Sequence, residues 1–274
     1  MADGWQDDHP AARLLDADFR CWDDASVDWE QYDRVVIRST WDYTGRPGDF
    51  LSWCERIGER RLRNSPALVA FNADKRYLGD LAVDTVPTRF IAPGDELPAL
   101  SGEVVVKPSV SSGARDTGRF SEHMHHEARA LIELIHASGR VALLQPYMSD
   151  VDTRGETSIV MFAGEVSHVL SKRAVLAPDE VAPLAEGELA PARAMLEEDL
   201  VVAGRADAAQ LALAHELIAH IDARFGVPLY ARVDMLAGAD GRPLLIELEV
   251  IEPNLYLATA PGASERLAAA VRGS

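Results

Sequence analysis

Short apolar runs alternate with segments of helical periodicity along most of the chain, which is the pattern of a mixed α/β protein. In the first section, residues 1–71, the run Arg34–Arg38 predicts a strand. The segment Asp49–Arg60 carries its apolar residues at helical spacing and predicts a helix. The loop between them, Ser39–Tyr43, is polar and aromatic. Because ligands of α/β units gather at the C-terminal ends of strands, we expect this loop to face a binding site.

The rest of the chain divides into a second section, residues 72–147, and a third, residues 148–274. In chain order, the elements predicted here are helix 75–81, strand 103–108, helix 122–138, strand 141–144, strands 158–162 and 165–170, helix 206–225, and a hairpin of 229–237 with 244–251. The segment 177–205 is rich in Ala, Pro and Glu and weakly patterned, so we expect a surface excursion there.

The register of the last hairpin can be counted from its turn. Asp240-Gly241 is a favoured pair for a two-residue type I′ turn. Counting back from this pair places Asp234 opposite Glu247 and Arg232 opposite Glu249. Since side chains alternate along a strand, these four residues share one face. The opposite face is then formed by Val233, Met235, Ile246 and Leu248.

Three carboxylates and one arginine on one sheet face do not fit a hydrophobic core. Clusters of carboxylate oxygens suit hard cations such as Mg²⁺, which keeps some of its water and shares substrate phosphates. A solvated face with a cross-strand Arg–Glu pair would need no ligand at all. The residues alone leave both interpretations open.

Two lysines are candidates for binding a phosphate. Lys107 ends the valine run of the second section and precedes the small-residue loop Ser109–Ala114, whose backbone amides can close over an anion. Lys75 opens a helical segment. For either lysine taken alone, a place on the protein surface is the simpler interpretation.

The apolar strand that runs into a proline at Leu143–Tyr147 is a candidate place for adenine. Gln145 can hydrogen-bond a base there, and Asp152 follows near the expected ribose. A simple connection between two sections would have the same pattern, so nothing in these residues alone selects adenine.

The charge of the chain limits its partners. A formal net charge of −17 repels phosphate backbones and anionic membrane surfaces, so we expect no nucleic-acid or membrane partner. No apolar stretch approaches the roughly 20 residues needed to span a bilayer, and the acidic N-terminus does not resemble a signal peptide.

The cysteines and histidines do not indicate a transition-metal site. Cys21 and Cys54 match no metal or redox spacing, so we expect reduced thiols in a cytoplasmic protein. The run His123–His126 lacks a second cluster at ligand spacing, and a solvated helix end is the preferred interpretation. The oligomeric state is left open, with a homodimer as one possibility.

Together, the lysines, the small-residue loop and the acidic hairpin resemble the ATP-grasp superfamily. The ordered series of that family is a lysine before a helix, a strand-end lysine with a Ser/Gly loop, a hinge, and then Arg-x-Asp and Glu-x-Asn/Glu strands. The chain carries this series over about residues 64 to 262. The resemblance implies an ATP-grasp fold of the α/β (α+β) class. A small N-terminal α/β subdomain would precede two α+β subdomains that hold ATP in the cleft between them.

The resemblance also implies roles for individual residues. The nucleotide would be bound by Lys75, Lys107, Ser111, Ser112, Gly113, Gln145, Tyr147 and Asp152. Mg²⁺, with Mn²⁺ as an alternative, would be held by Asp234, Glu247 and Glu249. The transferring phosphoryl group would be contacted by Arg232, Lys107 and Lys172.

Within the superfamily, the segments Arg38–Tyr43 and Glu247–Pro253 look like the branch of O-ureido-D-serine cyclo-ligase and glutathione-synthetase-like ATP-binding domains. Two features depart from the family pattern. The last metal position is Glu249, where relatives often carry Asn. Relatives also begin with a strand, whereas this chain begins within the first helix, so we expect a truncated N-terminus or a sheet that lacks a strand.

The implied activity is that of an ATP-dependent carboxylate–amine ligase. Phosphoryl transfer activates a carboxylate as an acyl phosphate, and an amine of the same or another molecule attacks it. A non-catalytic nucleotide-binding or scaffold protein and a small-molecule kinase are the alternatives. Arg38 is the expected carboxylate clamp, because its guanidinium can pair both oxygens. His168 lies on a strand expected to line the cleft, although a place in the core is its alternative. The residues expected to contact a small amino-acid-like substrate are Arg38, Thr40, Trp41, Asp42, Tyr43 and His168.

Overall fold

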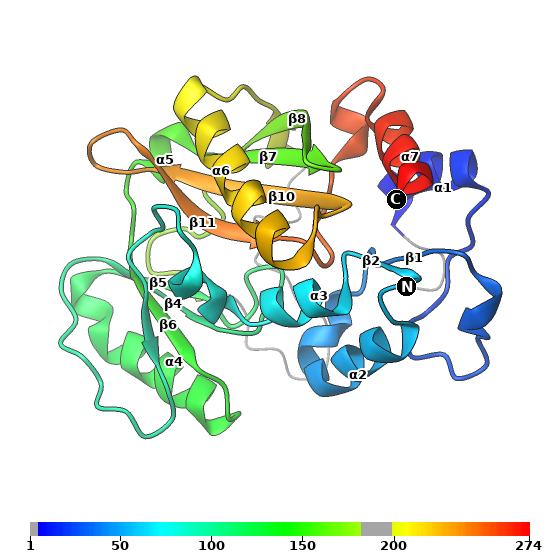
Figure 1. Cartoon of the computed structure of the whole chain (residues 1–274). Helices are drawn as coiled ribbons and strands as arrows, with labels where there is room; N and C mark the ends of the chain where they lie inside the picture. The colour runs from blue at the N-terminus through cyan, green and yellow to red at the C-terminus, as the bar shows by residue number, and fades with distance from the viewer. Residues whose placement is uncertain (1–4, 182–198) are drawn as a thin grey trace.

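The computed structural model describes residues 5–181 and 199–274, and its strands form three sheets (Figure 1). The first pairs β1 (Val35–Val36) in parallel with β2 (Leu62–Arg63). The second is antiparallel, in the order β3-β6-β4-β5, and contains β3 (Arg89–Ile91), β4 (Val104–Pro108), β5 (Gly118–Phe120) and β6 (Ala142–Pro146). The third is antiparallel, in the order β11-β10-β7-β8-β9, and contains β7 (Glu156–Phe162), β8 (Glu165–Lys172), β9 (Val201–Ala203), β10 (Tyr230–Ala237) and β11 (Pro243–Glu249).

Helices cover these sheets and connect them. The α-helices are α1 (His9–Leu15), α2 (Pro47–Ile57), α3 (Pro66–Asn72), α4 (His125–Ala137), α5 (Val151–Arg154), α6 (Ala208–Phe225) and α7 (Ala263–Gly273). Short 3₁₀ helices are η1 (Gln6–Asp8), η2 (Trp29–Gln31), η3 (Trp41–Gly45), η4 (Lys75–Asp80), η5 (Glu122–Met124) and η7 (Leu257–Thr259). Helices α1 and α7, from the two ends of the chain, lie side by side (Figure 1).

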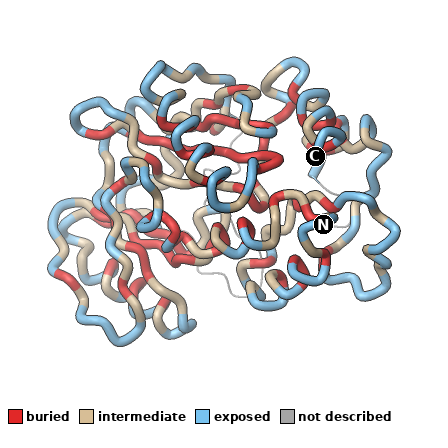
Figure 2. The backbone as a smooth tube through the Cα atoms, in the orientation of Figure 1, coloured by how far each residue is buried: buried red, intermediate tan, exposed pale blue. Residues whose placement is uncertain are grey.

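Helix α6 covers one face of the five-stranded sheet. It begins at a capping box, in which Asp207 and Gln210 each accept a hydrogen bond from the other's backbone N–H. Leu217 and Ile221 of its apolar face are fully buried in one cluster with residues of β10 and β11. The two central strands of this sheet, β7 and β10, are buried along most of their length (Figure 2). The opposite face carries Arg232 and Asp234, and at one end of it Phe162 and Tyr230 are buried in a cluster with residues of α7.

Strand β11 lies at the edge of its sheet, and side chains of the preceding segments cap its outer backbone. The Tyr77 hydroxyl accepts from the Leu248 N–H at 2.8 Å and donates to the Leu248 carbonyl at 2.9 Å. Asn72 donates to the same carbonyl at 2.7 Å and accepts from the Val250 N–H at 3.3 Å. Asn64 donates to the Val250 carbonyl at 2.6 Å. These bonds satisfy a buried strand edge and fix the backbone that carries Glu247 and Glu249.

Several predicted elements differ from those observed. The helix expected at 75–81 is the 3₁₀ helix η4, and the segment expected to be a surface excursion contains β9. The remainder of that excursion, residues 182–198, lies outside the described residues. Section boundaries at residues 71 and 147 stay a prediction. None of the helices in the described part of the chain is long and apolar enough to cross a membrane.

We predict that Tyr77→Phe lowers the free energy of unfolding by about 1–3 kcal/mol, because the buried Leu248 N–H loses its acceptor. Urea denaturation measures the change. The matched control is Tyr32→Phe, whose hydroxyl bonds Asp18 at an exposed position and whose loss should change stability by less than about 0.5 kcal/mol. Equal effects of the two substitutions would contradict the role given to Tyr77.

Candidate active site

A cleft of about 520 Å³ lies between the four-stranded and five-stranded sheets, which is enough for a nucleotide and a small second molecule. Its walls come from both sheets and from the N-terminal section. Of the residues proposed from the sequence, the cleft is lined by Trp41, Tyr43, Lys75, Lys107, Ser111, Ser112, Gly113, Gln145, Tyr147, Lys172, Arg232, Asp234, Glu247 and Glu249.

The hairpin register at this face agrees with the predicted one, although the turn does not. Asp234 pairs with Glu247 and Arg232 with Glu249. Beyond Asp234 the register shifts at a β-bulge, and Gly238 and Arg242 close a longer turn than the predicted two-residue one. The bulge offsets the extra turn residue, because two residues of the bulged strand then oppose one of its partner. It also places Ile246 in the cleft, which corrects its predicted position on the core face.

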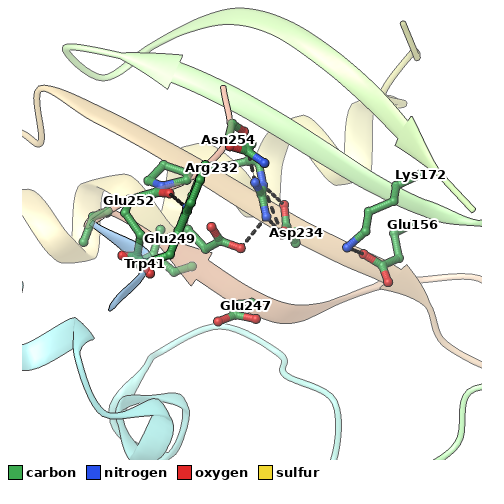
Figure 3. A network of polar contacts seen from close by, with 12 residues as sticks. Trp41, Glu156, Lys172, Arg232, Asp234, Glu247, Glu249, Glu252 and Asn254 are labelled. Carbon is green, nitrogen blue, oxygen red and sulfur yellow. Dashed lines mark hydrogen bonds and ion pairs between the residues drawn. The ribbon is translucent and has the colours of Figure 1, made fainter. Parts of the chain in front are cut away.

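Arg232 lies between two carboxylates of this face. Its Nη2 and Nε donate to Asp234 at 2.8 and 2.9 Å, and Nη2 also pairs with Glu249. Figure 3 shows this cluster, with the Lys172–Glu156 pair farther along the sheet. Asp234 and Arg232 are both buried, and the arginine holds the pKa of Asp234 below its usual value despite that burial.

The three predicted metal carboxylates share one face, but they do not converge on one point. Among residues 5–181 and 199–274, no three acidic, histidine or cysteine side chains are grouped closely enough to hold a metal ion. Asp234 and Glu249 contact Arg232, whereas Glu247 pairs with Lys75 at 3.0 Å. The expected convergence is not observed in this structure, whose carboxylates pair with internal cations, and the assignment of these three residues as metal ligands stays a prediction.

Negative charge at this face is only partly balanced. Burial raises the pKa of Glu249 to about 7, with Asp234 and Glu247 adding to the rise and Arg232 opposing it. Burial also raises the pKa of Glu252 to about 8, and Glu249 acts in the same direction. The face therefore retains a demand for positive charge.

Three lysines reach the cleft from different elements. The Lys75 ammonium donates to the Ser111 carbonyl at 2.6 Å and so ties the small-residue loop to Glu247. Lys172 pairs with Glu156 at 3.2 Å. Lys107 is buried, its ammonium group makes no hydrogen bond or ion pair with any residue the structure describes, and burial lowers its pKa. A buried cation without a partner is suited to an anionic ligand.

The far end of the cleft is apolar on both sides. Val86, Val151 and Leu236 form a buried cluster against which Tyr147 and Ile246 pack. Gln145 also lines the cleft, with its amide donating to Thr88 at 2.8 Å. An apolar end with one polar side chain suits a purine base.

The loop expected to bind substrate is only partly in the cleft. Trp41 and Tyr43 line it, whereas Thr40 and Asp42 do not. Arg38 is also outside the cleft lining. Its guanidinium donates to Asp8 at 3.1 Å and to the Pro253 carbonyl at 2.8 Å. The structure therefore does not place Arg38 in the cleft as a carboxylate clamp, because its Nε and Nη2 bond within the protein, and Nη1 is buried with no partner among the described residues.

Two other predicted residues lie away from the cleft lining. His168 is buried and bonds the Leu255 carbonyl at 2.7 Å, so it belongs to the core, as its alternative interpretation held. Asp152 pairs with Arg119 at 3.0 Å and accepts from the Tyr147 hydroxyl. It therefore orients Tyr147 and does not reach the cleft itself.

Several residues that line the cleft were not predicted as site residues from the sequence: Trp5, Glu156, Glu252, Asn254 and Tyr256. Glu156 pairs with Lys172 across β7 and β8, a register that a bulge near Val160 shifts away from simple counting. Glu252 and Asn254 follow the acidic strand directly, so the sequence Glu-Pro-Asn was a signal that could have been used.

Comparisons with known proteins point to one family. A family profile described as the N-terminal domain of D-cycloserine synthetase DcsG matches residues 3–64. The cycloserine biosynthesis protein DcsG of Streptomyces lavendulae is 36% identical over 265 residues, which is 91% of this chain and 86% of that protein. The chain belongs to the DcsG family. The crystal structure of D-cycloserine synthetase DcsG has a TM-score of 0.85 at 32% identity, covering 98% of this chain and 96% of that one.

More distant structures share the fold of this DcsG-family chain. A D-alanine–D-alanine ligase from Bacillus anthracis complexed with ATP has a TM-score of 0.62 at 12% identity, covering 100% of this chain and 93% of that one. An ADP complex of N5-carboxyaminoimidazole ribonucleotide synthetase also reaches 0.62, at 17% identity, covering 96% and 67%. The ATP-grasp fold expected from the sequence is confirmed. The chain is an ATP-dependent carboxylate–amine ligase, which sets aside the scaffold and kinase alternatives.

We predict that Lys107→Ala weakens ATP binding roughly 10- to 100-fold, the effect of a lost charge-assisted hydrogen bond, without lowering the melting temperature. Lys75→Ala should weaken ATP binding and also lower the melting temperature, because Glu247 is left without its cation. Calorimetric titration and thermal unfolding measure the two effects. Unchanged ATP affinity in Lys107→Ala would contradict the phosphate role of this lysine.

The stability of the ligand-free protein should fall as pH rises from about 5 to 8. Glu252 has a folded-state pKa of about 8 against a usual value of 4.5, so the unfolded chain gives up this proton first and is favoured across that window. In Glu252→Gln, urea midpoints should fall less steeply over the same range. If the urea midpoints of the two proteins fall equally with pH, Glu252 is not the group that causes the loss of stability.

Proposed function

We propose that this protein closes the ring of an O-ureido-D-serine-like substrate to give a cycloserine product. The supporting observation is the 36% identity to a cycloserine biosynthesis protein, over 91% of this chain and 86% of that protein. The branch resemblance of the segments Arg38–Tyr43 and Glu247–Pro253 supports the same substrate class.

Ring closure needs one activated carboxylate and one nitrogen of the same molecule. The γ-phosphoryl group of ATP passes to a carboxylate oxygen and leaves ADP. The nitrogen bonded to the side-chain oxygen then attacks the acyl carbon, loses its proton and expels phosphate. Water then adds to the carbamoyl carbon, and the bond between that carbon and the ring nitrogen breaks as the nitrogen takes up a proton. This leaves the cycloserine ring and releases carbamic acid, which decomposes to CO₂ and ammonia. Such a reaction depends on positioning and on charge neutralisation more than on a protein nucleophile.

The residues of the cleft can be given roles in this reaction. Lys75 and Lys107, with the loop Ser111–Gly113, would bind the phosphates, and Lys172 and Arg232 would face the transferring group. Gln145 and Tyr147 would border the adenine. The aromatic end with Trp41 and Tyr43 would hold the amino-acid part of the substrate.

The acidic face also fits a divalent cation in its donor chemistry. Asp234, Glu247 and Glu249 present hard oxygen donors on two paired strands, and the raised pKa of Glu249 indicates negative charge that Arg232 does not fully balance. These three residues would hold Mg²⁺, with Mn²⁺ as an alternative, and a bound ion would neutralise phosphate charge. A cytoplasmic location is part of the same proposal.

The test is turnover of O-ureido-D-serine with ATP and Mg²⁺. We expect ADP, phosphate and cycloserine in equal amounts, followed by a coupled ADP assay and mass spectrometry. The L-enantiomer and a D-alanine pair serve as control substrates, and Asp234→Asn serves as the control variant with strongly reduced turnover. ADP release that requires a separate amine, with a linear product, would contradict ring closure.

A further inference from the structure

The backbone that follows β11 is fixed from several directions at the end of the cleft opposite its apolar end. The carbonyls of four consecutive residues, 251–254, each accept a hydrogen bond from a side chain. In order, the donors are Tyr230, Trp41, Arg38 and Arg232, at 2.7, 3.2, 2.8 and 3.0 Å. The side chain of Glu252 is thus carried into the cleft on a rigid segment.

Glu252 differs from the other cleft carboxylates in having no cation. Glu247 pairs with Lys75 and Glu156 with Lys172, while Asp234 and Glu249 share Arg232. Among residues 5–181 and 199–274, no cation lies within ion-pair distance of the Glu252 carboxylate, and the hydrogen bond that lowers its pKa comes from its own backbone N–H. Burial outweighs this bond and the more distant charge of Lys75 and raises the pKa to about 8, so the ionised form is only weakly compensated. A cationic ligand would supply what the protein does not.

The walls around Glu252 favour an organic cation. Trp5 and Trp41 meet edge to face with centroids 5.5 Å apart, and both line the cleft with Tyr43. Asp7 holds the N-terminal segment in place by accepting from the backbone N–H groups of Leu257 and Ala258 at 2.6 and 2.9 Å. Aromatic faces attract ammonium groups, whereas Mg²⁺ needs several oxygen donors.

We propose that Glu252 binds the α-ammonium group of the amino-acid substrate, with Trp5 and Trp41 as the walls of this subsite. The inference rests on the proposed function and names the residue that selects an amino acid over a simple carboxylic acid. The α-carbon carries both carboxylate and ammonium, so the ammonium site must adjoin the phosphoryl-transfer face. Glu252 meets this requirement, because it follows Glu249 by three residues and lies on the side of Arg232 away from Lys172 (Figure 3).

The test compares wild type with Glu252→Gln on O-ureido-D-serine and on its analogue without the α-amino group. In the variant, KM for the amino acid should rise roughly 10- to 100-fold, while KM for ATP and for Mg²⁺ stays unchanged. The deamino analogue should have a high KM with both enzymes. Its KM should not rise further in the variant, because the analogue has no ammonium group for Glu252 to bind. Glu265→Gln, at an exposed position on α7, is the matched control and should behave as wild type. Thermal unfolding checks that the variant is folded.

Three results would overturn the inference: an unchanged KM for the amino acid, an equal loss on both substrates, or a shift in the KM for Mg²⁺ instead. If the wild type does not turn over O-ureido-D-serine, the proposed function itself fails. The subsite is then tested by calorimetric titration of D-serine into the protein with ATP bound. Wild type should bind D-serine at least roughly 10-fold more tightly than Glu252→Gln, and equal affinities would overturn the inference.

Discussion

The structure depends on burying charges of both signs where two sheets meet. Lys75 lies 3.0 Å from Glu247 and joins the segment that caps β11 to the acidic face, and Arg232 bridges Asp234 and Glu249 on that face. Either partner buried alone would cost several kcal/mol, so each group is tolerated only because the other is present. The capped outer edge of β11 keeps the two glutamates in the position that this balance requires.

The same balance accounts for how the cleft is prepared for its ligands. Most charges are paired internally, which keeps their side chains ordered before anything binds. The side chains of Lys107 and Glu252 are different, because neither has an oppositely charged group within ion-pair distance among the described residues. We expect Lys107 to contact an anionic group of a ligand and Glu252 to contact a cationic group. Because both side chains are already oriented, binding requires little reorganisation of the protein. An activated amino acid beside ATP presents such a pair of groups.

The sequence predicted the charged face well, because alternation along a strand places Arg232, Asp234, Glu247 and Glu249 on one side whatever the details of the turn. It could not reveal the bulge, since a bulge depends on how both strands pack, and so Ile246 was assigned to the wrong face. Arg38 was misjudged because its partners, Asp8 and the Pro253 carbonyl, are remote in sequence.

Positional isotope transfer gives the most direct test of the central claim, that this cleft moves a phosphoryl group onto a substrate carboxylate. O-ureido-D-serine labelled with ¹⁸O at both carboxylate oxygens is turned over with ATP, and the released phosphate is analysed by mass spectrometry. One ¹⁸O atom should appear in each phosphate, because the acyl phosphate cleaves between carbon and the labelled oxygen. Phosphate without label would contradict acyl phosphate formation and would assign the ATP cleavage to water.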